Sequence, residues 1–213
     1  MQINADFSQR AVVRFSQTPW VASPSAGVER KMLDRIGAEV ARATSLVRFA
    51  PGSDFTAHTH DGGEEYLVLD GTFADQDGAF PAGSYVRNPP TTHHHPAAPD
   101  GAIIFVKLHQ FDPEDRTSLH ARTDQPGLLF ENGEERVEII ELAPGETIKT
   151  SAPGGLELLV LEGELAENGG MLSGWDWLRL PVAGLLDATA SERGARLWMK
   201  TGHLASRPPK APL

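Results

Sequence analysis

Two histidines and a nearby glutamate have the side-chain types and the spacing of a metal site. His58 and His60 stand one residue apart in a predicted strand, and Asp61–Gly63 supplies a tight turn before Tyr66–Leu69. Because strand side chains alternate between faces, both imidazoles project to the same side, and the hairpin brings Glu64 back beside them. Imidazoles and carboxylates bind divalent metal ions, so this hairpin predicts a partial metal shell. The competing interpretation is a pair of solvent-exposed histidines beside an acidic turn.

A second segment, from Gly83 to His95, reads as a strand, a turn broken by prolines and the start of another strand. Together the two segments resemble the two cupin motifs, which match here at Gly52, His58, His60, Glu64 and Gly71, and at Gly83, Pro89 and His94. In cupins, the second-motif histidine completes a site of three histidines and one glutamate inside a small β-barrel, so the resemblance implies that His94 is the third imidazole ligand. The chain departs from the pattern at Thr91, where glycine is usual, and at Ala98, where asparagine is usual.

The resemblance narrows to the ChrR-type cupin family through residues 24–34, 58–65 and 81–90. That family includes the zinc-binding cupin domain of the anti-sigma factor ChrR. It also includes proteins similar to acetylacetone and dihydroxyacetophenone dioxygenases. The resemblance covers nearly the whole chain. It implies an all-β protein built from tandem cupin domains, which are RmlC-like jelly-roll β-barrels with mainly antiparallel strands.

The chain also repeats itself. Ala50–Gly52 recurs as Ala143–Gly145, Glu65–Gly71 as Glu157–Gly163, the strand from Gly83 as the strand from Gly174, and Gly101–Lys107 as Gly194–Lys200. Several matches in one order at a near-constant offset indicate two copies of one fold. We therefore expect a metal-binding cupin domain with N-terminal strands at residues 1–115, a linker at 116–125, a degenerate metal-free cupin domain at 126–205 and a tail at 206–213.

The second copy lacks the candidate ligands. Registration of the repeats places Ser151, Pro153, Leu156 and Leu185 opposite His58, His60, Glu64 and His94. Serine, proline and leucine are poor ligands for a divalent cation, so only the first barrel is expected to bind metal. Because Glu157 corresponds to Glu65, we assign Glu64 to the metal and Glu65 to a structural role. Strand alternation places His93 and His95 on the opposite face from His94, at the rim or the surface.

Composition excludes several classes of function. The 213 residues carry a formal net charge of -10, which argues against direct binding to nucleic acid or to anionic membranes. The chain contains no cysteine, which removes disulfides, thiolate catalysis and cysteine-based metal sites. No apolar run is long enough to span a bilayer, and the first residues lack the features of a signal peptide, so a cytoplasmic location is expected.

Residues of the substrate pocket are harder to place from sequence. Candidate wall residues for a small-molecule ligand are Phe55, Tyr66, Tyr85, Phe105 and Gln110. Ordinary barrel core is the competing interpretation for each aromatic residue, because small barrels fill their interior with side chains. Arg48 and Arg87 could bind an anionic substrate, although exposed strand arginines are common.

The predicted ligand set accepts several metals and leaves the function open. One divalent ion is expected, either Zn²⁺ or Fe²⁺, with Mn²⁺ and Ni²⁺ as alternatives. With iron, the resemblance implies a mononuclear non-haem dioxygenase cleaving a small diketone or hydroxyketone. The alternative is a stand-alone regulatory or stress-sensing zinc cupin; the absence of cysteine and of a sigma-binding domain argues against a sigma factor as partner. An isomerase on the same barrel is a weaker alternative, because no His–Tyr acid–base pair can be placed. Two fused barrels already imitate a cupin dimer, and the sequence leaves a further homodimer open.

Overall fold

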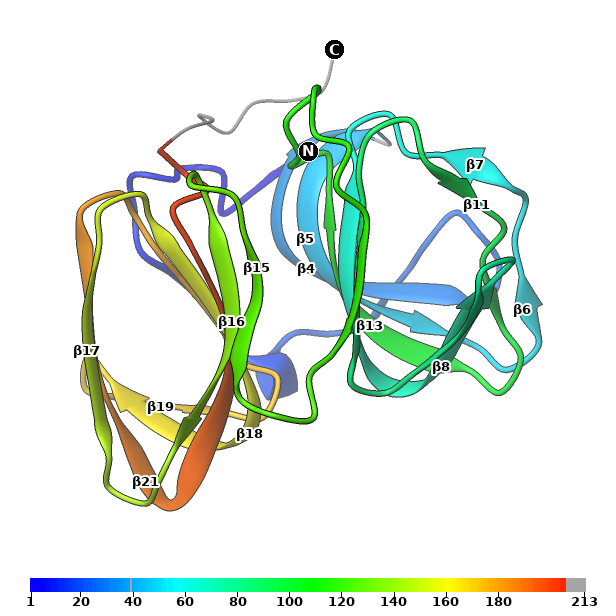
Figure 1. Ribbon diagram of the computed structural model, residues 1–213. Coiled ribbons are helices and arrows are strands. Elements are labelled where there is room, and N and C mark those ends of the chain that lie inside the picture. Colours follow the sequence, from blue (N-terminus) through cyan, green and yellow to red (C-terminus); the bar gives the residue numbers. More distant parts are fainter. Residues whose placement is uncertain (39, 206–213) are drawn as a thin grey trace. The chain divides into compact units, whose positions relative to one another are not determined.

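The computed structural model describes residues 1–38 and 40–205, so the predicted tail at 206–213 lies outside the described residues. These residues form two compact units (Figure 1). The first contains Met1–Ala5 and Pro19–Asp124, and the second contains Asp6–Thr18 and the described residues from Gln125 onward. The described part of the chain contains no α-helix, and its strand pairs are antiparallel, which confirms the predicted fold class.

The first unit is built on one large sheet in which β1, β4, β5, β13, β8, β10 and β14 are neighbours in that order. Its strands are β1 (Gln2–Ile3), β3 (Val21–Ala22), β4 (Val28–Gly37), β5 (Ala41–Phe49), β6 (Ser53–Asp54), β8 (Glu64–Asp75), β9 (Gly78–Pro81), β10 (Ser84–Asn88), β12 (Ala97–Ala98), β13 (Ala102–Leu108) and β14 (Leu119–Arg122). A separate two-stranded ribbon consists of β7 (His58–Thr59) and β11 (His93–His94), which lie side by side in Figure 1. This ribbon carries two of the predicted metal ligands.

The second unit repeats the central strand order as β15, β16, β21, β18, β20 and β2. Its elements are β2 (Ala11–Val13), the short 3-10 helix η1 (Phe15–Gln17), β15 (Gly127–Glu131), β16 (Arg136–Leu142), β17 (Thr147–Ala152), β18 (Leu156–Glu167), β19 (Gly170–Ser173), β20 (Trp177–Leu180) and β21 (Gly184–Thr201). In both units a central strand of 12 residues, β8 or β18, pairs with the last strand of the repeat, β13 or β21.

Two boundaries differ from those expected from sequence. Residues 6–18 were expected in the first domain, but β2 pairs with β20, so this segment belongs to the second unit. Part of the expected linker at 116–125 is a strand, because β14 pairs with β10 and extends the first sheet. Neither pairing leaves a local signal in the sequence. The β2–β20 pair joins segments that are far apart along the chain, and β14 lies at the edge of its sheet.

Strand alternation gives the first sheet one face toward the barrel interior. On β8, Tyr66 and Val68 point inward and contact Val86, Ile104 and Val106 from the flanking strands. Glu64 has the same parity as Tyr66, so it also points inward. The interior of the second unit is filled by aliphatic residues, including Leu156, Leu158, Leu186 and Leu197.

Two glycines show how closely the units repeat each other. Gly71 and Gly163 have φ of 70° and 74°, in the left-handed region that glycine tolerates best. A Cβ atom would lie 2.2 Å from the Gly101 carbonyl oxygen in the first unit, and 2.1 Å from that of Gly194 in the second. The same close approach of the same two turns in both units confirms the sequence repeat at these positions.

The repeat register needs one correction. Tyr85 pairs with Leu67, and Trp177 pairs with Leu159, so Tyr85 corresponds to Trp177. The counterpart of Gly83 is therefore Trp175 and not Gly174. The backbone agrees, because Trp175 has φ of 66°, close to the 84° of Gly83.

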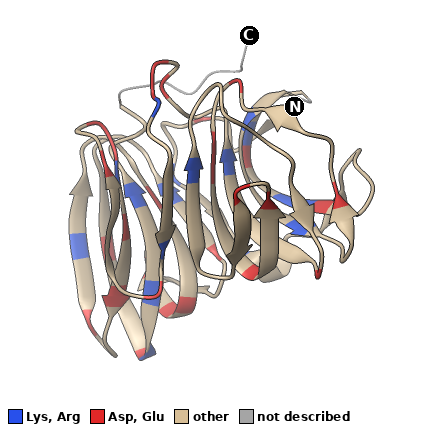
Figure 2. Cartoon of the chain, turned by 45° about the vertical axis from the view of Figure 1, so that its right-hand side comes forward, with Lys and Arg blue, Asp and Glu red and all other residues tan. Residues whose placement is uncertain are grey.

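Acidic and basic residues are interspersed along the strands and turns of each unit (Figure 2). Among the described residues, no helix is both long enough and apolar enough to cross a membrane.

Candidate metal centre

Three short segments of the first unit bring the predicted ligands together. His94 on β11 pairs directly with His58 on β7. His60 follows β7, where its backbone N–H donates to the Thr92 carbonyl and its own carbonyl accepts from Thr91. Glu64 begins β8 and lies between Leu108 and Asn88 of the neighbouring strands. The ribbon thus supplies the His58 and His94 imidazoles, the residue after β7 supplies that of His60, and the first residue of β8 supplies the carboxylate.

The imidazole rings converge on one another. Each of the three histidines offers a ring nitrogen, and these atoms all lie within 4.8 Å of one another. The ring centroids are separated by 5.3 Å for His58 and His60, 4.8 Å for His58 and His94, and 4.5 Å for His60 and His94. Ligand atoms about 2.1 Å from one ion are themselves about 3 to 4 Å apart, so small side-chain adjustments bring all three rings onto one cation.

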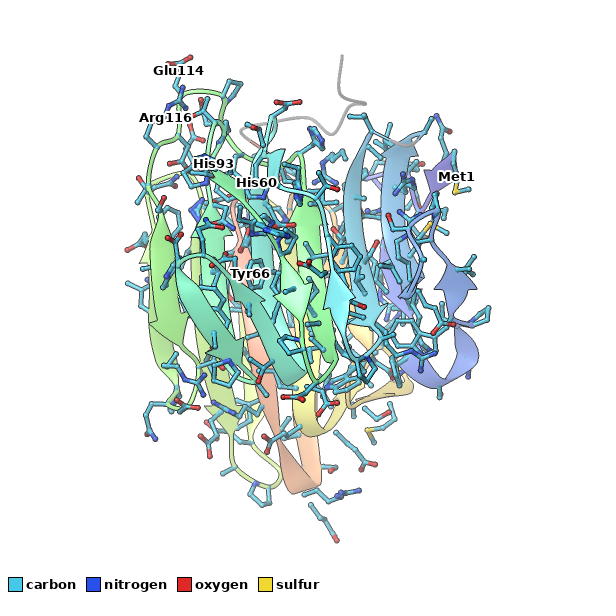
Figure 3. The ribbon with its side chains drawn as sticks, turned by 90° about the vertical axis from the view of Figure 1, so that its right-hand side faces the viewer. Met1, His60, Tyr66, His93, Glu114 and Arg116 are labelled. Atoms are coloured by element: carbon cyan, nitrogen blue, oxygen red, sulfur yellow. The ribbon has the colours of Figure 1, made fainter. Side chains whose placement is uncertain are left out.

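The Glu64 carboxylate points at the same place. Its Oε2 lies 3.4 Å from His60 Nε2 and 3.5 Å from His94 Nε2. Figure 3 shows His60 close to His93, with Tyr66 below them. The structure therefore brings together all four predicted ligands, His58, His60, Glu64 and His94.

The other ring nitrogen of each histidine is occupied. His94 Nδ1 lies 3.3 Å from Asp75 Oδ2, His60 Nδ1 lies 2.8 Å from Thr92 Oγ1, and His58 Nδ1 lies 3.2 Å from the Thr56 carbonyl oxygen. An imidazole that donates from Nδ1 presents the lone pair of Nε2, which is the form that binds a metal ion. These contacts fix the orientation of each ring toward the centre. The sequence motifs gave no signal for Asp75 or Thr92.

Unpaired buried atoms show that the site fits a cation. His60 Nε2, Glu64 Oε2 and the Tyr66 hydroxyl are buried and have no hydrogen-bond partner within the described protein. Buried polar atoms are almost always satisfied, so the unpaired His60 nitrogen and Glu64 oxygen, which lie 3.4 Å apart, indicate a missing partner. A divalent ion would satisfy the nitrogen and the carboxylate oxygen together.

The protonation states suit this role. Burial raises the pKa of the Glu64 carboxyl, but His60, His94 and His58 outweigh burial and hold it below its ordinary value. Burial also lowers the pKa of His94, although Glu64 acts in the opposite direction. Both shifts favour a neutral imidazole and an ionised carboxylate, the forms that metal binding requires.

A cavity of about 540 Å³ opens beside the ligands and is lined by His58, Glu64 and His94. Most of its remaining wall is apolar: Val28, Val47, Phe49, Phe55, Phe73, Pro96, Ile104, Val106 and Leu108. This volume is within the range of pockets that bind small organic molecules.

The predicted wall residues divide between the two faces of the sheet. Phe55 lines the cavity, and Tyr66 lies in the inner core against Phe73, outside the cavity lining. Tyr85 and Phe105 are corrections to the prediction, because strand parity turns both of them to the opposite face. The same parity places Glu65 on that outer face, where its carboxylate accepts a hydrogen bond from the Tyr85 hydroxyl at 2.6 Å.

Gln110 is also directed away from the cavity, because its side-chain amide donates to the Ala43 carbonyl and to Thr44 Oγ1. His93 and His95 are exposed, and His95 Nε2 lies 2.8 Å from Asp54 Oδ1. These positions agree with the rim location expected for both histidines.

The second unit offers no comparable group of ligands among its described residues. Ser151, Pro153 and Leu185 are exposed, and Leu156 is part of the apolar core. With the corrected register, counting from Trp175 places buried Leu186 at the position of His94. A leucine, Leu185 or Leu186, therefore stands opposite His94 in both the original and the corrected register. Aliphatic side chains in the second unit take the place of polar ligands in the first.

Thr91 occupies the position where the cupin pattern has glycine. Its φ is 77°, which a β-branched residue rarely adopts. The Thr91 N–H donates to the His60 carbonyl at 3.0 Å, so this strained residue helps to hold a ligand-bearing segment. The departure from the family pattern therefore preserves the backbone conformation that glycine normally provides.

Comparisons with known proteins agree with this fold. A candidate dioxygenase from Nostoc punctiforme has a TM-score of 0.73 at 12% identity, over 97% of this chain and 88% of that one. A bacterial pirin from Escherichia coli, solved in complex with nickel(II), has a TM-score of 0.70 at 14% identity, over 91% of this chain and 98% of that one. A single-site variant of oxalate decarboxylase from B. subtilis has a TM-score of 0.56 at 13% identity, over 90% of this chain and 77% of that one. None of the curated proteins matches the chain.

The family comparison bears on the first half of the chain. Residues 8–112 match the ChrR cupin-like domain family. This stretch contains all four converging ligands, the ribbon formed by β7 and β11, and every residue that lines the cavity. The protein therefore has the cupin fold and a metal-binding histidine triad, and the triad lies within the stretch that matches this family.

Proposed function

We propose that this protein is a mononuclear metal-dependent dioxygenase that acts on a small diketone or hydroxyketone. The observation that carries the proposal is the position of the ligands on the cavity wall. His58, Glu64 and His94 face a space of about 540 Å³, so a bound ion would be accessible to a small molecule. A site with a purely structural role is normally closed by its protein ligands.

The chain's own residues would bind and orient the substrate. His58, His60, His94 and Glu64 would hold the ion, and Asp75 and Thr92 would keep the His94 and His60 rings in place. When bound, a divalent ion supplies Lewis-acid polarisation of a chelating oxygen, and ferrous iron also supplies the redox chemistry that dioxygen requires.

The apolar wall would exclude water and accept the carbon skeleton. Phe49 packs edge-on against Phe55, with ring centroids 5.4 Å apart, and lies 5.1 Å from Phe73. All three rings line the cavity beside the ligands. A compact ketone with alkyl or aryl substituents matches this lining better than a sugar, which would need many polar partners.

Oxygen uptake tests the proposal. Metal-free protein is loaded with Fe²⁺ under anaerobic conditions and then mixed with oxygen and a panel of β-diketones and hydroxyacetophenones. We expect uptake with at least one compound, together with carbon–carbon cleavage products by mass spectrometry. The His94→Ala variant should show none, and His93→Ala, which changes an exposed neighbour, should behave like the wild type. Fully iron-loaded protein that consumes no oxygen across the panel would refute the proposal.

A regulatory role is the second candidate, and the match to the ChrR cupin-like domain favours it. In that case the metal-loaded protein would bind an extracytoplasmic-function sigma factor without turning over a substrate. Pull-down of such a factor that depends on an intact His60 would support this role. Turnover in the absence of any partner would argue for the enzyme.

A further inference from the structure

One cation stands in the wall of the metal cavity. Arg30 lies on β4 and shares its inward parity with Val28, which belongs to the inner core. It pairs with Val47 of β5, another residue of the cavity wall. Arg30 is half-buried and lines the same space as His58, Glu64 and His94. Of the lining residues, it is the one lysine or arginine.

The Arg30 guanidinium has no hydrogen bond or ion pair to any residue that the structure describes, whereas nearby acids are engaged elsewhere. The Glu29 carboxylate lies 2.5 Å from Arg48 Nη2, and Asp54 at the cavity wall pairs with His95. Glu64 faces the histidines. An arginine carries five N–H donors in a planar fork, and such donors are rarely left without an acceptor when they are removed from bulk water.

The rest of the wall indicates the class of acceptor. A guanidinium binds carboxylate or phosphate through two parallel hydrogen bonds. With no second lysine or arginine among the lining residues, a singly charged carboxylate suits the site better than a phosphate dianion. The aromatic and aliphatic residues that line the same cavity suit a short carbon skeleton.

We infer that the cavity takes a ketone that also carries a carboxylate, with its carbonyl oxygens toward the metal ligands and its carboxylate paired with Arg30. This inference rests on the proposed function and deepens it, because it makes Arg30 the residue that selects anionic substrates. Neither arginine singled out from sequence has this role. Arg48 is paired with Glu29, Arg87 is paired with Asp115, and neither lines the cavity.

The test compares a dioxo acid with its neutral ester. Protein loaded with Zn²⁺, which cannot turn the ligand over with oxygen, is titrated by calorimetry with 2,4-dioxopentanoate and with its methyl ester. We expect the acid to bind at least about ten-fold more tightly than the ester, since a hydrogen bond to a charged group contributes that much or more. Arg30→Gln should remove the preference, and Arg30→Lys should restore part of it. The matched control Arg48→Gln, on the same sheet, should leave it unchanged.

Three results would overturn the inference. Equal binding of acid and ester by the wild type would do so, as would an unchanged preference in Arg30→Gln or failure of the acid to bind zinc-loaded protein. If Arg30→Gln does not fold, Arg30→Lys decides. Because the carboxylate of a 2-oxo acid can also bind the zinc ion directly, an acid preference in Arg30→Lys as large as that of the wild type would overturn the inference. Acid preference without oxygen uptake by the iron form would reject the dioxygenase and keep the anion site. Oxygen uptake without acid preference would support the dioxygenase and reject the anion site at Arg30.

Discussion

His94 Nδ1 lies 3.3 Å from Asp75 Oδ2, although the two residues are 19 positions apart in the chain. Asp75 ends β8, the strand that Glu64 begins, so one strand supplies a carboxylate to the centre at one end and an orienting carboxylate at the other. Asp75 Oδ1 also accepts the Asp77 N–H at 2.8 Å, which fixes the carboxylate in the turn. The position of the His94 ring is therefore tied to the end of the central strand.

We predict that Asp75→Asn weakens metal binding without unfolding the protein. Removal of an orienting partner of a metal-ligating histidine typically lowers metal affinity about 10- to 100-fold. An asparagine can still cap the turn but places a neutral group beside His94. Competition with a chromophoric zinc chelator measures the affinity, and Asp77→Asn is the matched control. An unchanged affinity in Asp75→Asn would show that His94 does not depend on this contact.

The metal-free protein should lose stability on acidification. Burial lowers the pKa of His94 below its ordinary value of 6.5, so the unfolded chain binds this proton more readily than the folded one. The free energy of unfolding therefore falls as the pH drops below the pKa of His94 in the unfolded chain. The lowered pKa of Glu64 acts in the same direction below its ordinary value of 4.5. Urea denaturation at a series of pH values measures both effects. The His94→Gln variant should lose the decrease in stability that begins at the higher pH. If the stability of the variant depends on pH in the same way as that of the wild type, His94 is not the group responsible.

Gly71→Ala and Gly163→Ala should each destabilise the protein by roughly 3 kcal/mol. In both cases a new Cβ atom would lie within 2.2 Å of a carbonyl oxygen, and φ is in the left-handed region. Gly169→Ala is the control, because φ there is 75° but no other atom lies within 4 Å of the new Cβ. It should cost only about 1 kcal/mol. Equal losses at all three positions, measured by chemical denaturation, would show that the close approach of the turns has no effect.

Thr91→Gly should stabilise the protein. The threonine has φ of 77°, and a non-glycine residue in this region costs about 1 to 2 kcal/mol. The added flexibility of glycine in the unfolded chain offsets part of this, which leaves a gain of up to about 1 kcal/mol. Thermal unfolding checks the change, and Thr91→Ala, which keeps the strain, should show no gain. A lower melting temperature for Thr91→Gly would show that Thr91 is not strained in the folded protein.

Sequence reasoning predicted what depends on local pattern. The alternation around His58 and His60, the tight turn before Glu64 and the glycines at Gly71 and Gly163 each have a local signature, so these three ligand candidates and the repeat could be predicted. His94 was predicted through the resemblance to the second cupin motif. Asp75 and Thr92 could not, because each acts through a contact that forms only when distant strands pair.

The misplaced pocket residues have the same origin. Tyr85 and Phe105 have the right chemistry for a pocket wall, and only the strand register determines which face they occupy. The register of β10 also shows that Gly83 corresponds to Trp175, where a glycine match in the sequence indicated Gly174. Arg30 was missed because nothing in the sequence distinguishes an inward arginine on β4 from an exposed one.

Anomalous diffraction, on protein purified without nickel chromatography and loaded with Zn²⁺, is the most direct test of the metal centre. We predict one strong zinc peak per chain, about 2.1 Å from a ring nitrogen of each of His58, His60 and His94, with a Glu64 oxygen at a similar distance. The second unit should show no peak. A zinc ion bound elsewhere, or no ion between these three imidazoles at saturating zinc, would contradict the account.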